Sequence, residues 1–331
     1  MAAGAQTSKT SVDQTFSATR QARPLVTWLD IAFLIYYYPL RWLVAALGPR
    51  CLNWLQLCAE PVGRILQRGD LRIAERGMTK LLGFAPEQAR AFARQCCDNR
   101  VRTSLWELLP DEHAPGARPV RIEGREHLEQ ALKPGRGAVL VALHCLAKRE
   151  ARAGLQRAGI EYVPLIHVTK SHVRDRDPRY AGYGRLLWQF ARSRLHPMLW
   201  TKMSGYVARM DPDAVLKIMR ILRDGGLVMV SPDVAGTSSV QPVQFLSSLR
   251  RMSTGCLDIA RLTGCPLIPM WVWRSGNECV VEFHEPLRVC FDGGEETLES
   301  NVRVLIEAME RQLRAHPEQW ELWDQRVLGE S

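Results

Sequence analysis

The sequence predicts an α/β protein, with a mostly parallel sheet flanked by helices and an N-terminal membrane-associated helical segment. Two observations predict the sheet. Apolar runs such as 137–143 and 227–233 begin at or beside glycine and have the length and composition of strands that are buried on both faces. Amphipathic stretches of helical period separate these runs, and strands that alternate with helices form parallel sheets.

Composition and charge limit the class of protein. The chain has 331 residues, of which 46% are hydrophobic and 24% charged, and these fractions exclude a disordered or collagen-like chain. The net charge is +9, and residues 170–223 hold 12 Lys/Arg against 4 Asp/Glu, a net of +8. Such a segment suits an anionic partner, namely a nucleic acid, a phospholipid surface or an acidic carrier protein. The nine cysteines form no CxxC pair, which is typical of reduced thiols in a cytosolic compartment.

The N-terminal 50 residues divide into two parts. Residues 1–24 are polar and predict a flexible tail, whereas residues 25–50 are apolar and aromatic, which predicts membrane-associating helices. Asp30, Pro39 and Arg41 leave only 31–40 uninterrupted, which is shorter than the roughly 18 residues of a transmembrane helix. We therefore expect a membrane-embedded or interfacial helix pair, with its aromatic side chains at headgroup depth: Trp28, Tyr36, Tyr37, Tyr38 and Trp42. The alternative is an amphipathic segment that packs on the domain.

Residues 51–331 form the predicted α/β domain, which starts with a helical part, 51–112. Apolar residues recur at helical spacing within this part, and Pro86-Glu87 marks a further helix start. Short apolar or alternating runs then predict strands, and amphipathic stretches that end at glycine or proline predict the helices between them. The expected strands are 120–124, 137–143, 162–168, 227–233, 265–274 and 278–287, and the expected helices are 125–135, 151–159, 213–226, 256–264 and 298–317.

Two polar residues stand where predicted strands end, namely His144 and Asp233. Reactive groups of open α/β sheets collect at the carboxyl ends of the strands. A histidine there can act as a general base if a carboxylate orients its ring. The candidate carboxylates are Glu150 and Asp233, and the alternative is a purely structural histidine.

Four stretches resemble one known family, the bacterial lipid A biosynthesis acyltransferases, within the wider lysophospholipid acyltransferase group. They are VRIEGREHLEQALKPGRGAVLVALH (120–144), RILRDGGLVMVSPDVAGT (220–237), QFLSSLRRMSTGCLDIARLTGCPLIPMWVWR (244–274) and HPEQWELW (316–323). The resemblance implies an acyltransferase without a cofactor, at the cytoplasmic face of a bacterial inner membrane. It also implies acyl carrier protein or acyl-CoA as donor and a lipid, such as a glycolipid, as acceptor.

One motif departs from the family, whose signature is His, four residues, then Glu or Asp. Here Arg149 holds the acid's position and Glu150 follows one residue late, which turns the side chain by about 100° on a helix. Three possibilities stay open. Glu150 reaches His144 after a local adjustment, Asp233 replaces it, or the site binds without transferring.

Basic and hydroxyl residues are the candidates for substrate binding. Besides Arg149, one group lies on a predicted basic helix face that suits a phosphate, and another lies at the start of helix 256–264, where Ser and Thr could bind an anion or only cap the helix. These candidates are Arg185, Arg192 and Arg194 in the first group, and Arg250, Arg251, Ser253 and Thr254 in the second. Trp320 and Trp323 are expected to pack or to touch the membrane.

Other functions have weaker support. We expect no nucleic-acid partner, because no recognition module is present. We also expect no metal, because His167 and His172 span a predicted strand boundary. Cys145 beside His144 is read as a packed thiol rather than an acyl-accepting nucleophile. The remaining alternative is a non-catalytic membrane-bound protein that binds lipid or acyl carrier on the same scaffold.

Overall fold

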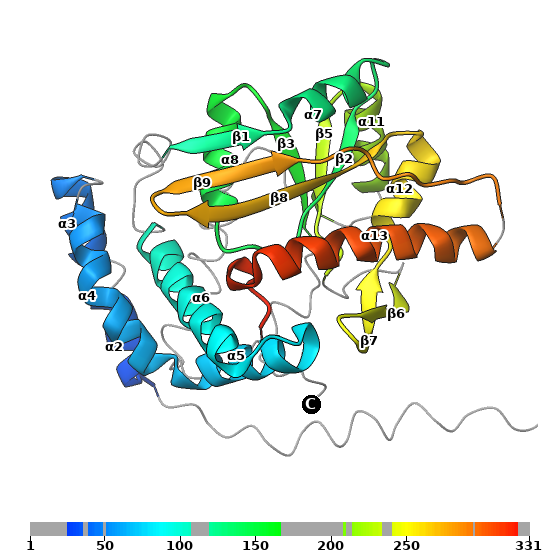
Figure 1. The fold of residues 1–331 in the computed structure, drawn as a ribbon. Coiled ribbons are helices and arrows are strands. Elements are labelled where there is room, and N and C mark those ends of the chain that lie inside the picture. The colour runs from blue at the N-terminus through cyan, green and yellow to red at the C-terminus, as the bar shows by residue number, and fades with distance from the viewer. Residues whose placement is uncertain are drawn as a thin grey trace, which may run out of the picture. The chain divides into compact units, whose positions relative to one another are not determined.

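The computed structural model describes residues 25–35, 39–48, 51–106, 119–166, 208–209, 214–233, 240–293 and 295–323. The chain forms two compact units, one of residues 1–39 and 170–203, and the other of residues 40–169 and 204–331. In the first unit the structure describes helix α2 (Trp28–Ile35). All other described elements belong to the second unit, whose fold is drawn in Figure 1.

A seven-stranded sheet forms the centre of the second unit, in the order β1-β9-β8-β2-β5-β3-β4. All neighbours pair in parallel except β8 and β9, which form an antiparallel hairpin. The predicted class, α/β with a mainly parallel sheet and helices, is therefore confirmed. The strands are β1 (Val120–Glu123), β2 (Ala138–Val141), β3 (Tyr162–Ile166), β4 (Ala208–Arg209), β5 (Leu227–Val230), β8 (Leu267–Ser275) and β9 (Glu278–Phe283).

Helices cover both faces of this sheet. The N-terminal helices of the second unit are α3 (Arg41–Leu47), α4 (Cys51–Leu66), α5 (Arg68–Leu82) and α6 (Pro86–Trp106). The helices between and after the strands are α7 (Arg125–Leu132), α8 (Lys148–Arg157), α11 (Ala214–Arg223), α12 (Gly255–Thr263), α13 (Glu295–Ala315) and the short 3₁₀ helix η5 (Pro317–Gln319). A separate hairpin joins β6 (Val240–Phe245) to β7 (Ser248–Ser253).

The core has two parts, one on each face of the sheet. Successive side chains of a strand point to opposite faces, so Val139 and Val141 of β2 join one cluster while Ala138 and Leu140 join the other. The first cluster includes side chains of α5, α6, α11, α12 and α13, and the second includes side chains of α7 and α8. Strand β2 is buried on both faces, as its continuous apolar run predicts.

The register of β2 and β5 places the polar ends of these strands together. Val141 lies opposite Val230 in the parallel pair. His144 follows Val141 by three residues, and Asp233 follows Val230 by the same number. Both residues therefore leave the sheet at its carboxyl edge, where open α/β sheets bind their ligands.

Candidate active site

His144 and Asp233 form a hydrogen-bonded pair at this edge of the sheet. The ring Nδ1 of His144 lies 2.6 Å from Oδ1 of Asp233, and the backbone N–H of His144 donates to Oδ2 at 2.8 Å. The carboxylate thus contacts both the ring and the backbone of the same histidine. This double contact fixes the ring relative to the chain that carries it.

Asp233 accepts a third hydrogen bond, from Nε1 of Trp320 at 2.9 Å. Its side chain is fully buried, and burial alone would raise the pKa of the carboxyl. The positive charge of His144, with the hydrogen bonds from His144 and Trp320, outweighs burial and lowers the pKa of Asp233. The site therefore holds an ionised carboxylate against the histidine ring.

The tautomer of His144 follows from this contact. A carboxylate is only an acceptor, so Nδ1 carries a proton, and in the neutral form of the ring Nε2 keeps its lone pair. The His144 side chain keeps 28% of its surface exposed, whereas Asp233 has none. A half-buried neutral imidazole with its Nδ1 bound to a buried carboxylate is suited to take a proton at Nε2.

The C-terminal segment holds the loop that carries His144. The backbone N–H of Glu321 donates to the carbonyl of His144 at 2.8 Å, and the N–H of Leu146 donates to the carbonyl of Gln319 at 2.9 Å. Cys145 and Trp320 form an antiparallel bridge between these two bonds. The 316–323 segment thereby fixes His144 from the opposite end of the sequence.

Trp320 and Trp323 are both buried in the core, where their rings pack edge to face with centroids 4.9 Å apart. Packing, one of the two expectations for these residues, is confirmed. The other expectation, that they touch the membrane, is wrong, because each tryptophan exposes only 1% of its surface. The role of Trp320 as a hydrogen-bond donor to Asp233 was not predicted.

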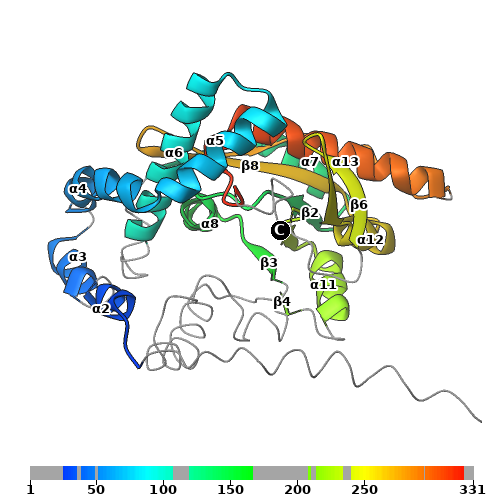
Figure 2. The same ribbon diagram turned by 90° about the horizontal axis from the view of Figure 1, so that it is seen from below.

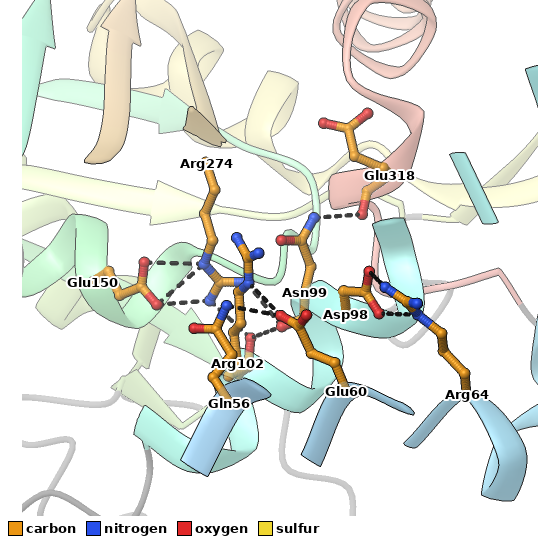
Figure 3. Close-up of polar contacts among 10 residues, drawn as sticks. Gln56, Glu60, Arg64, Asp98, Asn99, Arg102, Glu150, Arg274 and Glu318 are labelled. Atoms are coloured by element: carbon orange, nitrogen blue, oxygen red, sulfur yellow. Dashed lines mark hydrogen bonds and ion pairs between the residues drawn. The ribbon is translucent and has the colours of Figure 1, made fainter. Parts of the chain in front are cut away.

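Glu150 pairs with Arg274 (Figure 3), and its hydrogen bonds do not reach His144. Nε of Arg274 donates to the two carboxylate oxygens at 3.1 and 3.0 Å, and Nη2 donates to Oε1 at 2.7 Å. Both side chains are buried. Of the two candidate carboxylates, the geometry therefore favours Asp233 as the partner of His144.

Arg274 also bonds α6 and the loop after His144. Nη1 donates to the carbonyl of Asn99 in α6, and Nη2 donates to Oγ1 of Thr103 and to the carbonyl of Leu146. Leu146 lies two residues after His144, so this arginine also holds the His144 loop. A buried guanidinium that makes six hydrogen bonds within the protein is a positioning group rather than a site for substrate.

Cys145 is buried, as expected, and burial raises the pKa of its thiol to about 12. The thiol is therefore protonated at neutral pH, and a protonated thiol is a poor nucleophile. The reading of Cys145 as a packed residue fits this environment.

A second charged pair lies beside His144. Nζ of Lys148 contacts Oε2 of Glu321 at 3.1 Å, and the same Glu321 bonds the carbonyl of His144 through its backbone. Burial disfavours the charged form of both groups, but the opposite charge of the partner and the hydrogen bond between them outweigh this effect. The pKa of Lys148 is therefore raised and the pKa of Glu321 is lowered. His-x3-Lys is a local sequence signal that could have drawn attention to Lys148.

Arg250 is the predicted substrate-binding residue that the structure brings toward the pair. Its guanidinium carbon lies 5.8 Å from the ring centroids of both Phe245 and Trp320, and Trp320 bonds Asp233. Arg251, the next residue on β7, is exposed. A guanidinium over the ring that binds the carboxylate places one cation within reach of the candidate site.

The other predicted binding residues have separate positions. Ser253 is buried, and its backbone N–H donates to the carbonyl of Pro232, next to Asp233. Thr254 occupies the N-cap position of α12 but makes no capping hydrogen bond with its side chain. Arg149 is half-buried on α8. Arg185, Arg192 and Arg194 lie outside the described residues, as do Tyr36, Tyr37, Tyr38, His167 and His172.

Within the described ranges no three His, Cys, Asp or Glu side chains lie close enough to hold a metal ion. In the same ranges, none of the helices has the length and apolar character that crossing a membrane requires.

Comparison with known protein families adds one match. The sequence model described as bacterial lipid A biosynthesis acyltransferase matches residues 190–328. The resemblance to this family is confirmed. The matched residues include Asp233, Arg250 and the 316–323 segment, whereas His144 precedes them. No curated protein matches the chain.

The match to this family supports acyl transfer in general as the activity of the protein. The structure shows that the matched region contributes the carboxylate and the tryptophan of the His144 pair. A site with a buried carboxylate, a histidine with an available nitrogen and a nearby guanidinium has the groups that acyl transfer to a hydroxyl or amine uses.

Proposed function

We propose that the protein transfers a fatty acyl chain from a thioester donor to a hydroxyl or amine of a lipid or lipid-like acceptor, with His144 as general base. The observation that carries the proposal is the 2.6 Å contact between Nδ1 of His144 and the buried carboxylate of Asp233. It occurs in a chain whose residues 190–328 match an acyltransferase family. Asp233 orients the ring and stabilises the imidazolium that forms when Nε2 takes a proton.

The reaction would proceed in two steps. In the first, Nε2 removes the proton of the acceptor O–H or N–H while the acceptor atom attacks the thioester carbonyl carbon and the carbonyl π electrons move to oxygen. In the second, the oxyanion re-forms the carbonyl, the C–S bond breaks, and the thiolate takes the proton from Nε2. No covalent acyl-enzyme is required, which agrees with the protonated state of the buried Cys145 thiol.

Arg250 is our candidate for stabilising negative charge in this site. Its guanidinium lies over the Trp320 ring, which in turn bonds Asp233, so a cation stands close to the dyad. Positive groups that face a developing oxyanion or a bound phosphate lower the energy of both. Arg149, Arg251, Ser253 and Thr254 stay candidates for donor or acceptor binding.

The resemblance to the family and the positive charge of the chain support our proposals for the donor and the location. An acyl carrier protein is acidic and acyl-CoA carries phosphates, so either would be attracted to a chain of net charge +9. A lipid acceptor places the reaction at a membrane, and we propose the cytoplasmic face of a bacterial inner membrane. We also propose that residues 25–50 take part in this association, since Trp28 and Trp42 are both strongly exposed.

The alternative is a protein that binds lipid or acyl carrier without transfer. A degenerate site would be expected to lose the carboxylate that orients the histidine. Here the His-x4-acid motif is shifted, but His144 still has a carboxylate partner, because Asp233 lies at hydrogen-bond distance. This contact favours the enzyme over the binding protein.

The proposal is tested by transfer from a labelled acyl thioester to extracted bacterial lipids, with the purified full chain in detergent. Acyl carrier protein and coenzyme A thioesters are compared as donors. We expect a labelled lipid with the native chain and none with His144→Ala, while circular dichroism shows both proteins folded. Transfer by His144→Ala at the native rate, or saturable lipid binding without transfer by the native chain, would overturn it.

A further inference from the structure

The outward face of α4 is apolar. Trp54, Leu57, Val62, Ile65 and Leu66 expose between 54% and 74% of their surfaces. The first four recur at a spacing of three, then five, then three residues, which places them on one side of the helix. Exposed Cys58 and Pro61 fall on the same side. A contiguous exposed apolar face of this kind marks an interaction surface.

The inward face of α4 buries Leu52 and Gly63, and polar side chains flank this contact. Gln56, Glu60 and Arg64 recur every four residues on the side that meets α6 (Figure 3). Arg64 makes two hydrogen bonds of 2.7 and 2.6 Å with Asp98. Arg102 donates to Glu60 at 3.0 Å. Ion pairs to α6 therefore act together with the burial of Leu52 and Gly63 to hold α4 with its exposed apolar side outward.

Close packing supports this orientation. A Cβ atom at Gly63 would clash with the side chain of Val101, so the two helices approach closely at a glycine. In both views α6 lies between α4 and α13, with α4 on the outer side (Figures 1 and 2). The apolar face of α4 is thus directed away from the sheet and its core.

Unpaired positive charge adjoins this face. Arg68 begins α5 two residues after Leu66 ends α4, so their Cα atoms are within about 7 Å of one another. Arg68, Arg72 and Arg76 are exposed, and none of them makes an ion pair or hydrogen bond within the part of the chain that the structure describes. Their spacing of four residues places like charges side by side, which costs free energy that an anionic surface would offset.

These features together identify one kind of partner. An apolar helix face with tryptophan, next to arginines without counter-ions, matches helices that lie in the interface of an anionic bilayer. A face that docked an acidic protein would need less apolar surface, and an interface between two copies would bring the arginines toward each other's like charge. Helix α3, which contacts α4, adds exposed Trp42, Leu43 and Leu47.

We propose that α4, with the first three arginines of α5, is a docking surface for an anionic phospholipid bilayer. This contact lies beyond residues 25–50. The inference rests on the proposed function in one respect, since a lipid acceptor requires access to a bilayer. Docking of α4 would hold α6 at a fixed height above the lipid, together with the Arg274 network that holds the His144 loop.

Two exposed cysteines allow a direct test. Cys58 lies on the outward side of α4, and Cys290 is exposed in the segment before α13. An environment-sensitive fluorophore is attached to Cys58 in a chain with Cys51→Ser and Cys290→Ser, and to Cys290 in a chain with Cys51→Ser and Cys58→Ser. Both chains carry His144→Ala, so catalysis plays no part and failure of the proposed function would not affect the result.

We expect a blue shift at Cys58, and none at Cys290, when vesicles of three parts phosphatidylethanolamine to one part phosphatidylglycerol are added. Leu57→Ser with Ile65→Ser should weaken vesicle affinity at least about tenfold, because two exposed apolar side chains no longer enter the bilayer. The matched control is Leu216→Ser with Leu262→Ser, which removes two similarly exposed leucines from α11 and α12 and should leave affinity unchanged.

The arginines supply a second arm. Arg68→Gln, Arg72→Gln and Arg76→Gln together should remove the preference for phosphatidylglycerol over phosphatidylcholine vesicles and most of the salt dependence of binding. Equal vesicle affinity of the native chain and Leu57→Ser/Ile65→Ser would overturn the proposal. So would a Cys58 signal that depends on protein concentration without lipid, since a second copy would then occupy the face.

Discussion

Removing Glu150 should destabilise the fold without removing the base. In Glu150→Ala, the Arg274 side chain keeps its contacts to Asn99, Thr103 and Leu146 but loses its three bonds to the Glu150 carboxylate. The side chains of Arg274 and Glu150 expose 2% and 1% of their surfaces, so the guanidinium charge of Arg274 stays buried in the variant. Breaking a buried ion pair from one side costs about 3–5 kcal/mol.

This cost should appear as a lower melting temperature. For a domain of this size, one kcal/mol corresponds to roughly 2–4 °C, so Glu150→Ala should melt roughly 6–20 °C below the native chain. The assay is thermal unfolding followed by far-UV circular dichroism. The control is Glu129→Ala, which breaks the exposed Arg125–Glu129 pair of 2.7 Å and should change stability by less than about 1 kcal/mol.

A double variant separates the pair from its surroundings. Once Glu150 is absent, replacing Arg274 by Met removes the uncompensated charge, so the second substitution should cost less in the Glu150→Ala background than in the native chain. Unchanged stability of Glu150→Ala together with loss of acyl transfer would refute this reasoning. Glu150 would then act with His144 in the bound state.

Three further predictions concern the site itself. Trp320→Phe removes one of the three bonds to Asp233, and loss of a bond to a charged group should lower kcat/KM about 10- to 100-fold, as measured by initial rates. The lowered pKa of Asp233 means that its carboxylate stabilises the fold above about pH 4, the ordinary value, and that this stabilisation is lost as pH falls through its folded pKa. The melting-temperature gap between the native chain and Asp233→Asn should accordingly narrow from pH 6 to pH 3, and a gap that widens would contradict this. Cys145→Ala should keep transfer within about threefold, and iodoacetamide at pH 8 should not modify Cys145 in the folded chain, because its thiol pKa is about 12.

The sheet and its central strands could be predicted because their signal is local. Runs such as 137–143 are apolar throughout, and burial on both faces is the state that such runs favour. The sequence also places His144 and Asp233 at the ends of predicted strands, but it leaves both Glu150 and Asp233 open as the partner of the histidine. The structure decides between them, because β2 pairs with β5 and each of the two residues comes three residues after a paired strand end.

The β6–β7 hairpin had no such signal. Two-residue hairpin turns with positive φ at both positions favour Asn and Gly, whereas this turn is made by Leu246 and Ser247 with φ of 50° and 61°. Without a turn signature, the residues around 240–253 give no indication of a hairpin. Tertiary packing selects the turn here, as buried Leu246 shows.

The hydrogen-bond partners of Glu150 and Trp320 could not be predicted, because they lie far away in the sequence. Arg274 lies 124 positions after Glu150, and Trp320 lies 87 after Asp233. No local pattern shows that a glutamate on the first turn of α8 faces a buried arginine of β8. The same holds for a C-terminal tryptophan that donates to a carboxylate at the edge of the sheet.

The central claim is that Asp233, and not Glu150, makes His144 a base for acyl transfer. The most direct measurement is the initial rate of transfer from a labelled acyl thioester to lipid by Asp233→Asn and Glu150→Gln, at a temperature where both are folded. We predict at least about a 100-fold loss for Asp233→Asn and a rate within about tenfold of the native chain for Glu150→Gln. A native rate for Asp233→Asn, with transfer abolished in folded Glu150→Gln, would contradict the account.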